Sequence, residues 1–407
     1  MIRRFLVLAV CAASAFGAER RDWQALRTQV RATLHIPNPL PDLRSKSYGR
    51  FAPASGVAAE RVAYSTAYDL RVPAILYHQG SATVAQHPAV IVVNGHKGDK
   101  SSWYAYWAGI LYARAGGIVL TYDPIGEYER NTQRKSRTGQ HDLVLEPDDM
   151  ARRLSGLMIT DLMQAVSYLQ SRSDVDSKRI AVLGYSMGSF ISSIACAVDT
   201  RIHACVLAGG GDLDGPGGYW DQSNKMCQGI PYQSLSFLGD RGAMLYAMNA
   251  KRGPTLIYNG SDDDVVDITH HGESWFNDLR KRTITETGSS KGVFETEFDG
   301  GGGHRPYFLT KPVALWLEEK LKFPNWTRKQ IEAMSETHVA EWAQKNGLVE
   351  SITPVYLHDE GGTVALGNDI SPVPRDQLYA VPETVWRADQ ADFVYESWVE
   401  RARGDER

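Results

Sequence analysis

The sequence lacks the features that mark nucleic-acid-binding and membrane-spanning proteins. Its 407 residues include 44 Lys and Arg against 48 Asp and Glu, so there is no basic surplus to bind nucleic acid. Beyond the N-terminus, no stretch reaches the ~18 consecutive apolar residues that a transmembrane helix needs. No internal repeat is visible. We therefore expect a soluble globular protein with no nucleic-acid partner and no membrane span.

Cysteine is also scarce. Only Cys196, Cys205 and Cys227 lie beyond the N-terminal apolar run, and an odd number of thiols leaves at least one outside any pairing within the chain. The first two fall in apolar segments, where a free cysteine is usually a small buried side chain. The adjacent His270 and His271 would point apart on a helix, and no Cys or His spacing is typical of a metal site. The sequence predicts neither a metal nor a cofactor.

The N-terminus has the pattern of an export signal. Arg3 and Arg4 precede an apolar run of about a dozen residues, and small residues follow as far as Ala18. This run is too short for a stable membrane span and is typical of a cleaved signal peptide. We expect residues 1–18 to be removed and the protein to be periplasmic or secreted.

The most informative motif is Gly-Tyr-Ser-Met-Gly at residues 184–188. It follows an apolar run, 179–183, and opens a small-residue helical stretch, 189–196. A strand, a tight turn and a helix around G-x-S-x-G form a nucleophile elbow, in which the flanking glycines relieve steric collisions. The pattern predicts Ser186 as a nucleophile at a helix N-terminus, where the dipole favours negative charge.

A serine hydroxyl needs a base, and the base needs a carboxylate to orient it. In hydrolases with this elbow, the order along the chain is Ser, then Asp or Glu, then His. His304 follows the glycine run 300–303 and is the predicted base. Asp263 follows a predicted strand and is the predicted orienting carboxylate. Asp262 and Asp264 remain alternatives for that role, or for capping the next helix.

Backbone donors for an oxyanion come from two places. Residues 89–93 read as a buried central strand, and a glycine-containing loop, 94–98, follows it. We expect the N–H groups of His96 and Met187 to form the oxyanion hole. Two such donors together stabilise the oxyanion of the transition state by several kcal/mol. The His96 side chain is expected to line the pocket or to cap the next helix.

Several of these segments resemble the α/β-hydrolase superfamily. The resemblance is strongest to its bacterial branch of dienelactone-hydrolase-like and acetyl-xylan-esterase-like enzymes, which is related to the prolyl-oligopeptidase catalytic domain. Its most specific pieces are residues 93–98, 122–130 (Tyr-Asp-Pro-Ile-Gly-Glu-Tyr-Glu-Arg), 184–188, 259–266 and 301–305. It implies an α/β-hydrolase fold and a serine esterase acting on small acyl groups such as acetyl, on a small-molecule or carbohydrate ester.

Alternating strand and helix patterns from Ala89 onward predict a mostly parallel sheet with helices on both faces. We divide the chain into a signal (1–18), a helical and extended segment (19–60), a catalytic domain (61–323) with an insertion (209–253), and a C-terminal accessory extension (324–407). Helices are expected at 20–34, 101–115, 147–171 and 329–345. The insertion is expected to be a lid or pocket wall, with a purely structural excursion as the alternative.

Five aromatic side chains are candidates to line the pocket. Trp103 and Trp107 follow the oxyanion loop, Tyr185 lies in the elbow, and Tyr219 and Trp220 lie in the insertion. Aromatic faces suit sugar rings, although an i, i+4 pair such as Trp103 and Trp107 is more often core packing.

Two other functions remain open. A serine peptidase of the prolyl-oligopeptidase type would share the triad, but the chain has no long N-terminal propeller region and no acidic pair suited to a free amine. A non-catalytic binding protein on a hydrolase scaffold is the third candidate; such proteins usually lose a triad member. An esterase is therefore the predicted function.

Overall fold

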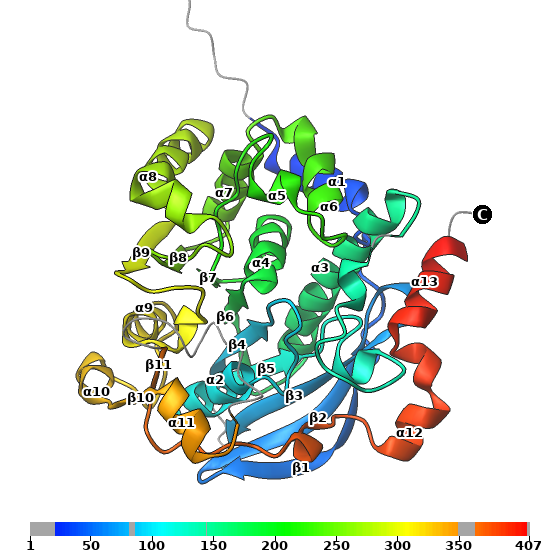
Figure 1. Cartoon of the computed structure of the whole chain (residues 1–407), viewed down its shortest axis with the longest axis vertical. Helices are drawn as coiled ribbons and strands as arrows, with labels where there is room; N and C mark the ends of the chain where they lie inside the picture. Colours follow the sequence, from blue (N-terminus) through cyan, green and yellow to red (C-terminus); the bar gives the residue numbers. More distant parts are fainter. Residues whose placement is uncertain (1–20, 81–85, 144, 349–362, 405–407) are drawn as a thin grey trace, which may run out of the picture.

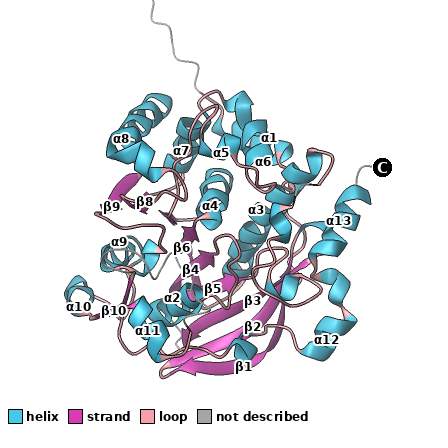
Figure 2. Cartoon of the chain, in the orientation of Figure 1, coloured by secondary structure: helices cyan, strands magenta, loops and turns pink. Residues whose placement is uncertain are grey.

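A nine-stranded sheet organises the protein. The computed structural model describes residues 21–80, 86–143, 145–348 and 363–404, so the predicted signal peptide lies outside the described residues. The strand order is β1-β2-β3-β5-β4-β6-β7-β8-β9 (Figures 1 and 2). The strands are β1 (Lys46–Ala54), β2 (Val57–Ser65), β3 (Arg71–Gln79), β4 (His87–Val93), β5 (Ile118–Tyr122), β6 (Val175–Tyr185), β7 (Ala204–Ala208), β8 (Thr255–Gly260) and β9 (Glu295–Asp299).

The sheet is antiparallel at one end and parallel from β5 to β9. Crossover helices link the parallel strands, as parallel connections require. The predicted mostly parallel sheet is confirmed. The edge strand β1 was not predicted, because its alternation is weak and most of its residues are exposed or only half-buried.

Helices cover both faces of the sheet (Figure 1). Side chains from α1 (Trp23–Thr33), α3 (Asp149–Gln170), α4 (Met187–Val198), α7 (Arg241–Ala250) and α8 (Ile268–Thr287) join one buried cluster. Those from α2 (Trp103–Arg114) and α9 (Lys311–Leu321) join the other. The shorter helices are α5 (Tyr219–Gln222), α6 (Gly229–Ser234), α10 (Arg328–Ala333), α11 (Val339–Lys345), α12 (Glu383–Ala388) and α13 (Tyr395–Gly404). Among the described helices, none is long and apolar enough to cross a membrane.

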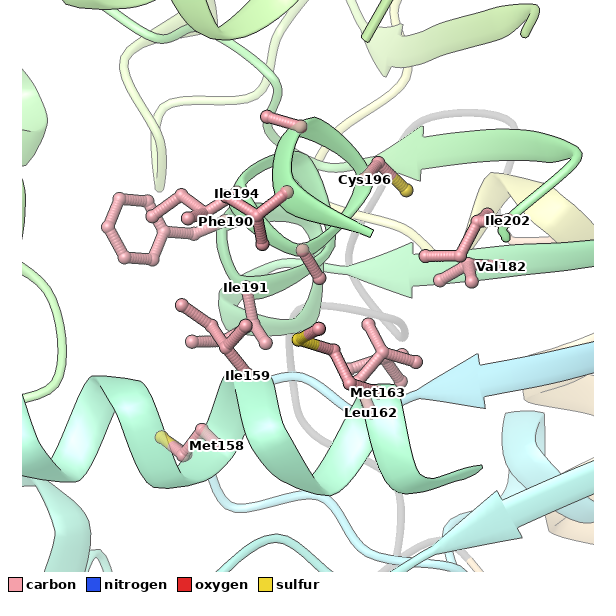
Figure 3. Close-up of a cluster of buried hydrophobic side chains, with 14 of the residues drawn as sticks. Met158, Ile159, Leu162, Met163, Val182, Phe190, Ile191, Ile194, Cys196 and Ile202 are labelled. Atoms are coloured by element: carbon pink, nitrogen blue, oxygen red, sulfur yellow. The ribbon is translucent and has the colours of Figure 1, made fainter. Parts of the chain in front are cut away.

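Strand β6 contributes side chains to both buried clusters. Val182 packs on the side of α3 and α4, whereas its neighbour Leu183 packs on the opposite side, because successive side chains of a strand alternate faces. Figure 3 shows Ile191 of α4 facing Ile159 of α3, and Val182 of β6 at the other end of the cluster, next to Ile202. All of these side chains are almost completely buried. This packing fixes the helix that follows the elbow against the rest of the core.

The predicted insertion 209–253 contains three helices. Helix α7, at its end, packs against both α4 and α8 and leads into β8, so it is the crossover helix between β7 and β8. The segment before it, with α5 and α6, packs on the core: Trp220 and Tyr232 lie against Phe190 of α4, and α6 also contacts α3. The predicted domain boundaries otherwise remain predictions.

The predicted helix 329–345 was wrong as a single element. It is divided into α10 and α11 by a short strand, β10 (Glu336–His338), which pairs with β11 (Val364–Leu366). The Trp342 indole N–H of α11 donates to the Ile370 carbonyl at 2.8 Å. A pairing with residues about thirty positions further on therefore overrides local helix propensity.

The C-terminal extension holds onto the catalytic framework through a buried carboxylate. Glu129 accepts hydrogen bonds from the backbone N–H groups of Ala380 (2.7 Å) and Val381 (3.0 Å). It also pairs with Lys100 at 2.6 Å and with Arg134 at 2.7 Å. Removing one partner from such a buried group typically costs about 3–5 kcal/mol. The extension is thus part of the folded core.

One buried carboxylate in the segment between β7 and α5 predicts a pH effect on stability. Burial raises the pKa of Asp214 to about 7. An acid whose folded pKa lies above its unfolded value stabilises the fold at low pH and loses that contribution as pH rises toward the folded pKa. The free energy of unfolding of Asp214→Asn should therefore rise relative to that of the parent between pH 5 and pH 7, by at most about 1.4 kcal/mol per pH unit. Its melting temperature should rise relative to the parent over the same range.

Thermal unfolding of both proteins across this pH range measures the effect. The exposed Asp376 offers a matched control, Asp376→Asn. A difference between Asp214→Asn and the parent that is the same at pH 5 and pH 7 would contradict the prediction.

Candidate active site

Ser186 stands in a strained turn between β6 and α4. Its backbone has φ 55° and ψ −119°, a region that non-glycine residues rarely adopt. The Ser186 N–H donates to the Ala208 carbonyl at 3.0 Å, which holds the turn to β7. Strain of this kind, of order 1–3 kcal/mol, persists where the surrounding structure enforces it and is concentrated at functional sites.

The neighbouring glycines explain why the turn is possible. A Cβ added to Gly188 would overlap the Val93 carbonyl oxygen of β4, and one added to Gly184 would overlap the Gly188 carbonyl oxygen. A Cβ added to Gly95 would lie 3.0 Å from the Ser186 Cβ. The strand end, the helix start and the loop after β4 therefore meet at distances that only glycine permits.

The side chains of His304 and Asp263 lie together. The Nδ1 atom of His304 is 2.8 Å from Oδ2 of Asp263. The other carboxylate oxygen accepts the N–H groups of Val265 (3.0 Å) and Val266 (3.4 Å), and Asp263 is fully buried. A buried, hydrogen-bonded carboxylate on Nδ1 leaves Nε2 of the imidazole free to act as a base.

The alternative aspartates face solvent. Asp262 and Asp264 are both exposed, and Asp262 accepts a hydrogen bond from its neighbour Ser261 at 2.8 Å. Neither caps α8, whose N-cap residue is Asp267. Of the three consecutive aspartates, only Asp263 contacts the histidine ring through a hydrogen bond that the structure describes.

The His304 ring packs between two elements near the elbow. Its centroid lies 5.0 Å from that of Tyr185, whose hydroxyl donates to the His304 carbonyl at 3.0 Å. On the other side, a Cβ on Gly209 would lie 2.9 Å from Cε1 of His304. Gly209 directly follows β7, and Tyr185 is the last residue of β6, directly before Ser186. The histidine ring therefore lies against the strand ends next to the serine. His304 is 8% exposed and Ser186 9%, which leaves both accessible from one side.

Both predicted oxyanion donors are available. In the described part of the chain, the backbone N–H groups of Met187 and His96 have no hydrogen-bond acceptor. Met187 is the first residue of α4, and His96 is next to Gly95, which touches Ser186. Donors reserved for a substrate oxygen must be unoccupied in the free protein.

The structure places the two predicted pocket tryptophans against the C-terminal extension. Trp107 is fully buried, and its indole N–H donates to the Leu366 carbonyl of β11 at 2.9 Å. Trp103 is 7% exposed and packs edge-on against Trp107 (6.1 Å between centroids) and near Trp342. Both side chains form the surface on which the C-terminal extension packs.

Tyr219 and Trp220, the two aromatics of the segment before α7, differ in burial. Trp220 is buried and stacks on Phe190 of α4 at 4.7 Å, so its side chain also packs in the core. Tyr219 is half-buried, and burial, together with nearby carboxylates that include Asp212 and Asp263, raises its pKa to about 12. Tyr185 and Tyr219 are therefore the candidate pocket aromatics that remain close to the triad residues.

Asp212 is a buried acid near the site that the sequence analysis missed. Burial and the neighbouring Asp214 hold its pKa well above the usual range, and Asp263 adds to the effect. Nδ1 of His271 lies 3.5 Å from its Oδ2. Nothing in the local sequence distinguishes Asp212, because its proximity to Asp263 arises from the neighbouring positions of β7 and β8 in the sheet.

A cluster of possible metal ligands, which sequence spacing did not indicate, lies beside the loop after β4. One side-chain ligand atom each from His96, His141 and Asp142 lie within 4.8 Å of one another. Burial, followed by the neighbouring His96, lowers the pKa of His141 to about 4. The residues come from separate segments, so only the fold brings them together. They are the described residues best suited to hold a metal ion.

Comparisons with known proteins match parts of the chain to hydrolases. The acetyl xylan esterase (AXE1) family model matches residues 49–208, and the prolyl oligopeptidase family model matches residues 148–323. YtaP of Bacillus subtilis is 47% identical over 51 residues, which cover 12% of this chain and 17% of that protein. Cutinase 1 of Thermobifida cellulosilytica is 29% identical over 152 residues, 37% of this chain and 48% of that protein. The chain thus matches less than half the length of these relatives.

Among solved structures, the acetyl xylan esterase from Paenibacillus sp. R4 has a TM-score of 0.51 and 15% sequence identity, covering 75% of this chain and 96% of that one. At this identity the likeness shows the fold. The predicted fold is confirmed, and the esterase family match supports a carboxylic ester hydrolase. The chain therefore has an α/β-hydrolase fold, and separate parts of it match the acetyl xylan esterase and prolyl oligopeptidase family models.

Proposed function

We propose that the protein is an exported serine esterase that hydrolyses short-acyl esters, acetyl esters above all, on a carbohydrate or another small alcohol. The observation that carries this proposal is the His304–Asp263 pair, whose ring is seated against the strand ends that present Ser186. The nucleophile, the general base and the carboxylate that orients the base each have a candidate side chain there.

The mechanism follows from those roles. The Ser186 hydroxyl adds to the ester carbonyl while Nε2 of His304 takes its proton, and Asp263 stabilises the resulting imidazolium through Nδ1–H. The N–H groups of Met187 and His96 bind the oxyanion. His304 then protonates the leaving alkoxide, and water attacks the acyl-enzyme by the same sequence of proton transfers. No cofactor is needed.

The relatives support a short acyl group on a sugar. The matched family is named for acetyl xylan, an acetylated polysaccharide. Tyr185 and Tyr219 supply aromatic surface beside the triad without a fixed charge. Such a surface discriminates between acyl chains by only about 1–3 kcal/mol per methylene, so the preference for acetyl over longer chains should be shallow.

A peptidase is the second candidate, because the prolyl oligopeptidase family model matches residues 148–323, the part of the chain that holds the triad residues. Both chemistries use an acyl-enzyme, so the triad does not separate them. The difference lies in the leaving group that the pocket accepts.

Turnover of both substrate classes on one preparation separates these functions. We expect acetyl and propionyl p-nitrophenyl esters and acetylated sugars to be hydrolysed with higher kcat/KM than long-chain esters, and dipeptidyl and prolyl amides to be cleaved slowly or not at all. Ser186→Ala is the matched control and should lose about four to six orders of magnitude in rate and all labelling by a fluorophosphonate. Faster turnover of the amides would establish a peptidase instead.

Three asparagine variants test the choice of carboxylate. Asp263→Asn should lower kcat by about ten-thousand-fold, because the amide no longer fixes the tautomer of His304. Asp262→Asn and Asp264→Asn are matched controls in the same loop and should retain kcat within a few-fold, since both side chains are exposed. Loss of activity in Asp264→Asn with retention in Asp263→Asn would reverse the assignment.

Export is tested by the mature N-terminus. The apolar run and the small residues that end at Ala18 lead us to expect cleavage near Gly17 or Ala18. Mass spectrometry of the native protein from the periplasm or medium measures the terminus. Mature protein that retains Met1 would exclude the proposed export.

A further inference from the structure

Four potential metal ligands from three separate segments converge beside the oxyanion loop. Nε2 of His96 lies 3.0 Å from Oδ1 of Asp142 and 3.4 Å from Sγ of Cys227. Oδ1 of Asp142 lies 4.0 Å from the same sulfur and 3.9 Å from Nε2 of His141. Zinc bonds of ~2.0–2.3 Å at tetrahedral angles separate ligand atoms by ~3.3–3.8 Å, and these four separations are close to that range. The sulfur of Cys227 adjoins the mutually close group of His96, His141 and Asp142 through His96 and Asp142.

His141 is the residue that simple ion pairing leaves unexplained. It is fully buried, and its Nδ1 lies 3.0 Å from the Ile125 carbonyl oxygen. A carbonyl oxygen can only accept a hydrogen bond, so Nδ1 carries the proton and Nε2 of the neutral ring presents a lone pair. Among the residues that the structure describes, that Nε2 has no hydrogen-bond partner. A metal-bound histidine typically donates its second ring N–H to a carbonyl or carboxylate in this way.

The surroundings also suit a dication. The second oxygen of Asp142 pairs with Nζ of Lys225 at 3.1 Å, which leaves Oδ1 toward His96. Cys227 is completely buried, and it forms no disulfide with another described cysteine. The His96 side chain is 22% exposed and that of Asp142 11%, which leaves one accessible side for ion entry.

We propose that His96, His141, Asp142 and Cys227 form a binding site for a zinc-like transition-metal ion. Two imidazoles, a thiolate and a carboxylate are a donor set of intermediate softness that suits Zn²⁺ and not Mg²⁺ or Ca²⁺. One thiolate and one carboxylate neutralise the charge of the ion. On binding, the proton of the Cys227 thiol and any proton on Nε2 of His96 pass to solvent.

The ion would join three segments that form the walls of the site. They are the loop after β4, the residues around the short 3₁₀ turn Gln140–Asp142, and the segment that precedes α6. Because His96 belongs to the first of these, the ion would also fix the backbone N–H that we assign to the oxyanion. Only this last consequence rests on the proposed esterase function.

Metal binding is measured directly on the full-length protein. After treatment with a chelator and removal of it, we expect the parent to take up about one equivalent of Zn²⁺ by elemental analysis and to gain melting temperature. Asp142→Asn and Cys227→Ser, which keep side-chain volume, should weaken binding at least about tenfold, as should His141→Gln. His270→Asn is the matched control at an exposed histidine and should bind as the parent does.

Cobalt substitution tests the sulfur ligand. Co²⁺ bound to the parent should show a thiolate-to-cobalt absorption band that is absent in Cys227→Ser. Failure of the parent to retain stoichiometric Zn²⁺, or equal affinity in the parent and the three ligand variants, would overturn the site. These readouts do not depend on catalysis, so loss of the esterase proposal would leave the metal result standing.

Discussion

The close approach of three backbone segments at the elbow is the constraint on which the site depends. The Gly188 backbone lies against the Val93 carbonyl at the end of β4, and Gly95 lies against Ser186 itself. This contact requires β4 and β6 to be neighbours in parallel register, with Val93 opposite Gly184. The central pairing thereby places the nucleophile and the oxyanion loop at the same edge of the sheet, at the carboxyl ends of parallel strands.

The strain in that turn is compensated by the packing beneath it. Helix α4 is buried along its whole length, and its apolar side chains interlock with α3 and β6 (Figure 3). A buried aliphatic side chain contributes about 1.5–3 kcal/mol, so a few such residues exceed the cost of one strained residue. The same core thus stabilises the fold and holds Ser186 in its unfavourable conformation.

Sequence reasoning identified what depends on local pattern and on chain order. The elbow, His304 and Asp263 could all be named because each follows a recognisable strand and because glycine marks the tight turns. The orientation of Trp107 could not be predicted, since the surface that buries it comes from β11, more than 250 residues away. The division of helix 329–345 likewise depends on a partner strand whose pattern is too short to recognise.

The cluster of His96, His141, Asp142 and Cys227 was missed for a related reason. Metal motifs are recognised from sequence when two ligands share one helix or loop at a fixed spacing. Here only His141 and Asp142 are close in sequence, and the other two ligands lie 45 positions before and 85 positions after them. Their convergence is a property of the loops above the sheet.

The segment between β7 and α7 connects these features with substrate choice. Its first residue, Gly209, contacts His304, and Cys227 further along contacts His96 of the oxyanion loop. One segment therefore touches the base and the loop that carries an oxyanion donor, and it also carries Tyr219. The two family models overlap at residues 148–208, which include the elbow, so the elbow is the part of the site common to both. We expect the loops outside that overlap to set specificity, because this segment lies against both the His304 ring and His96 of the loop after β4.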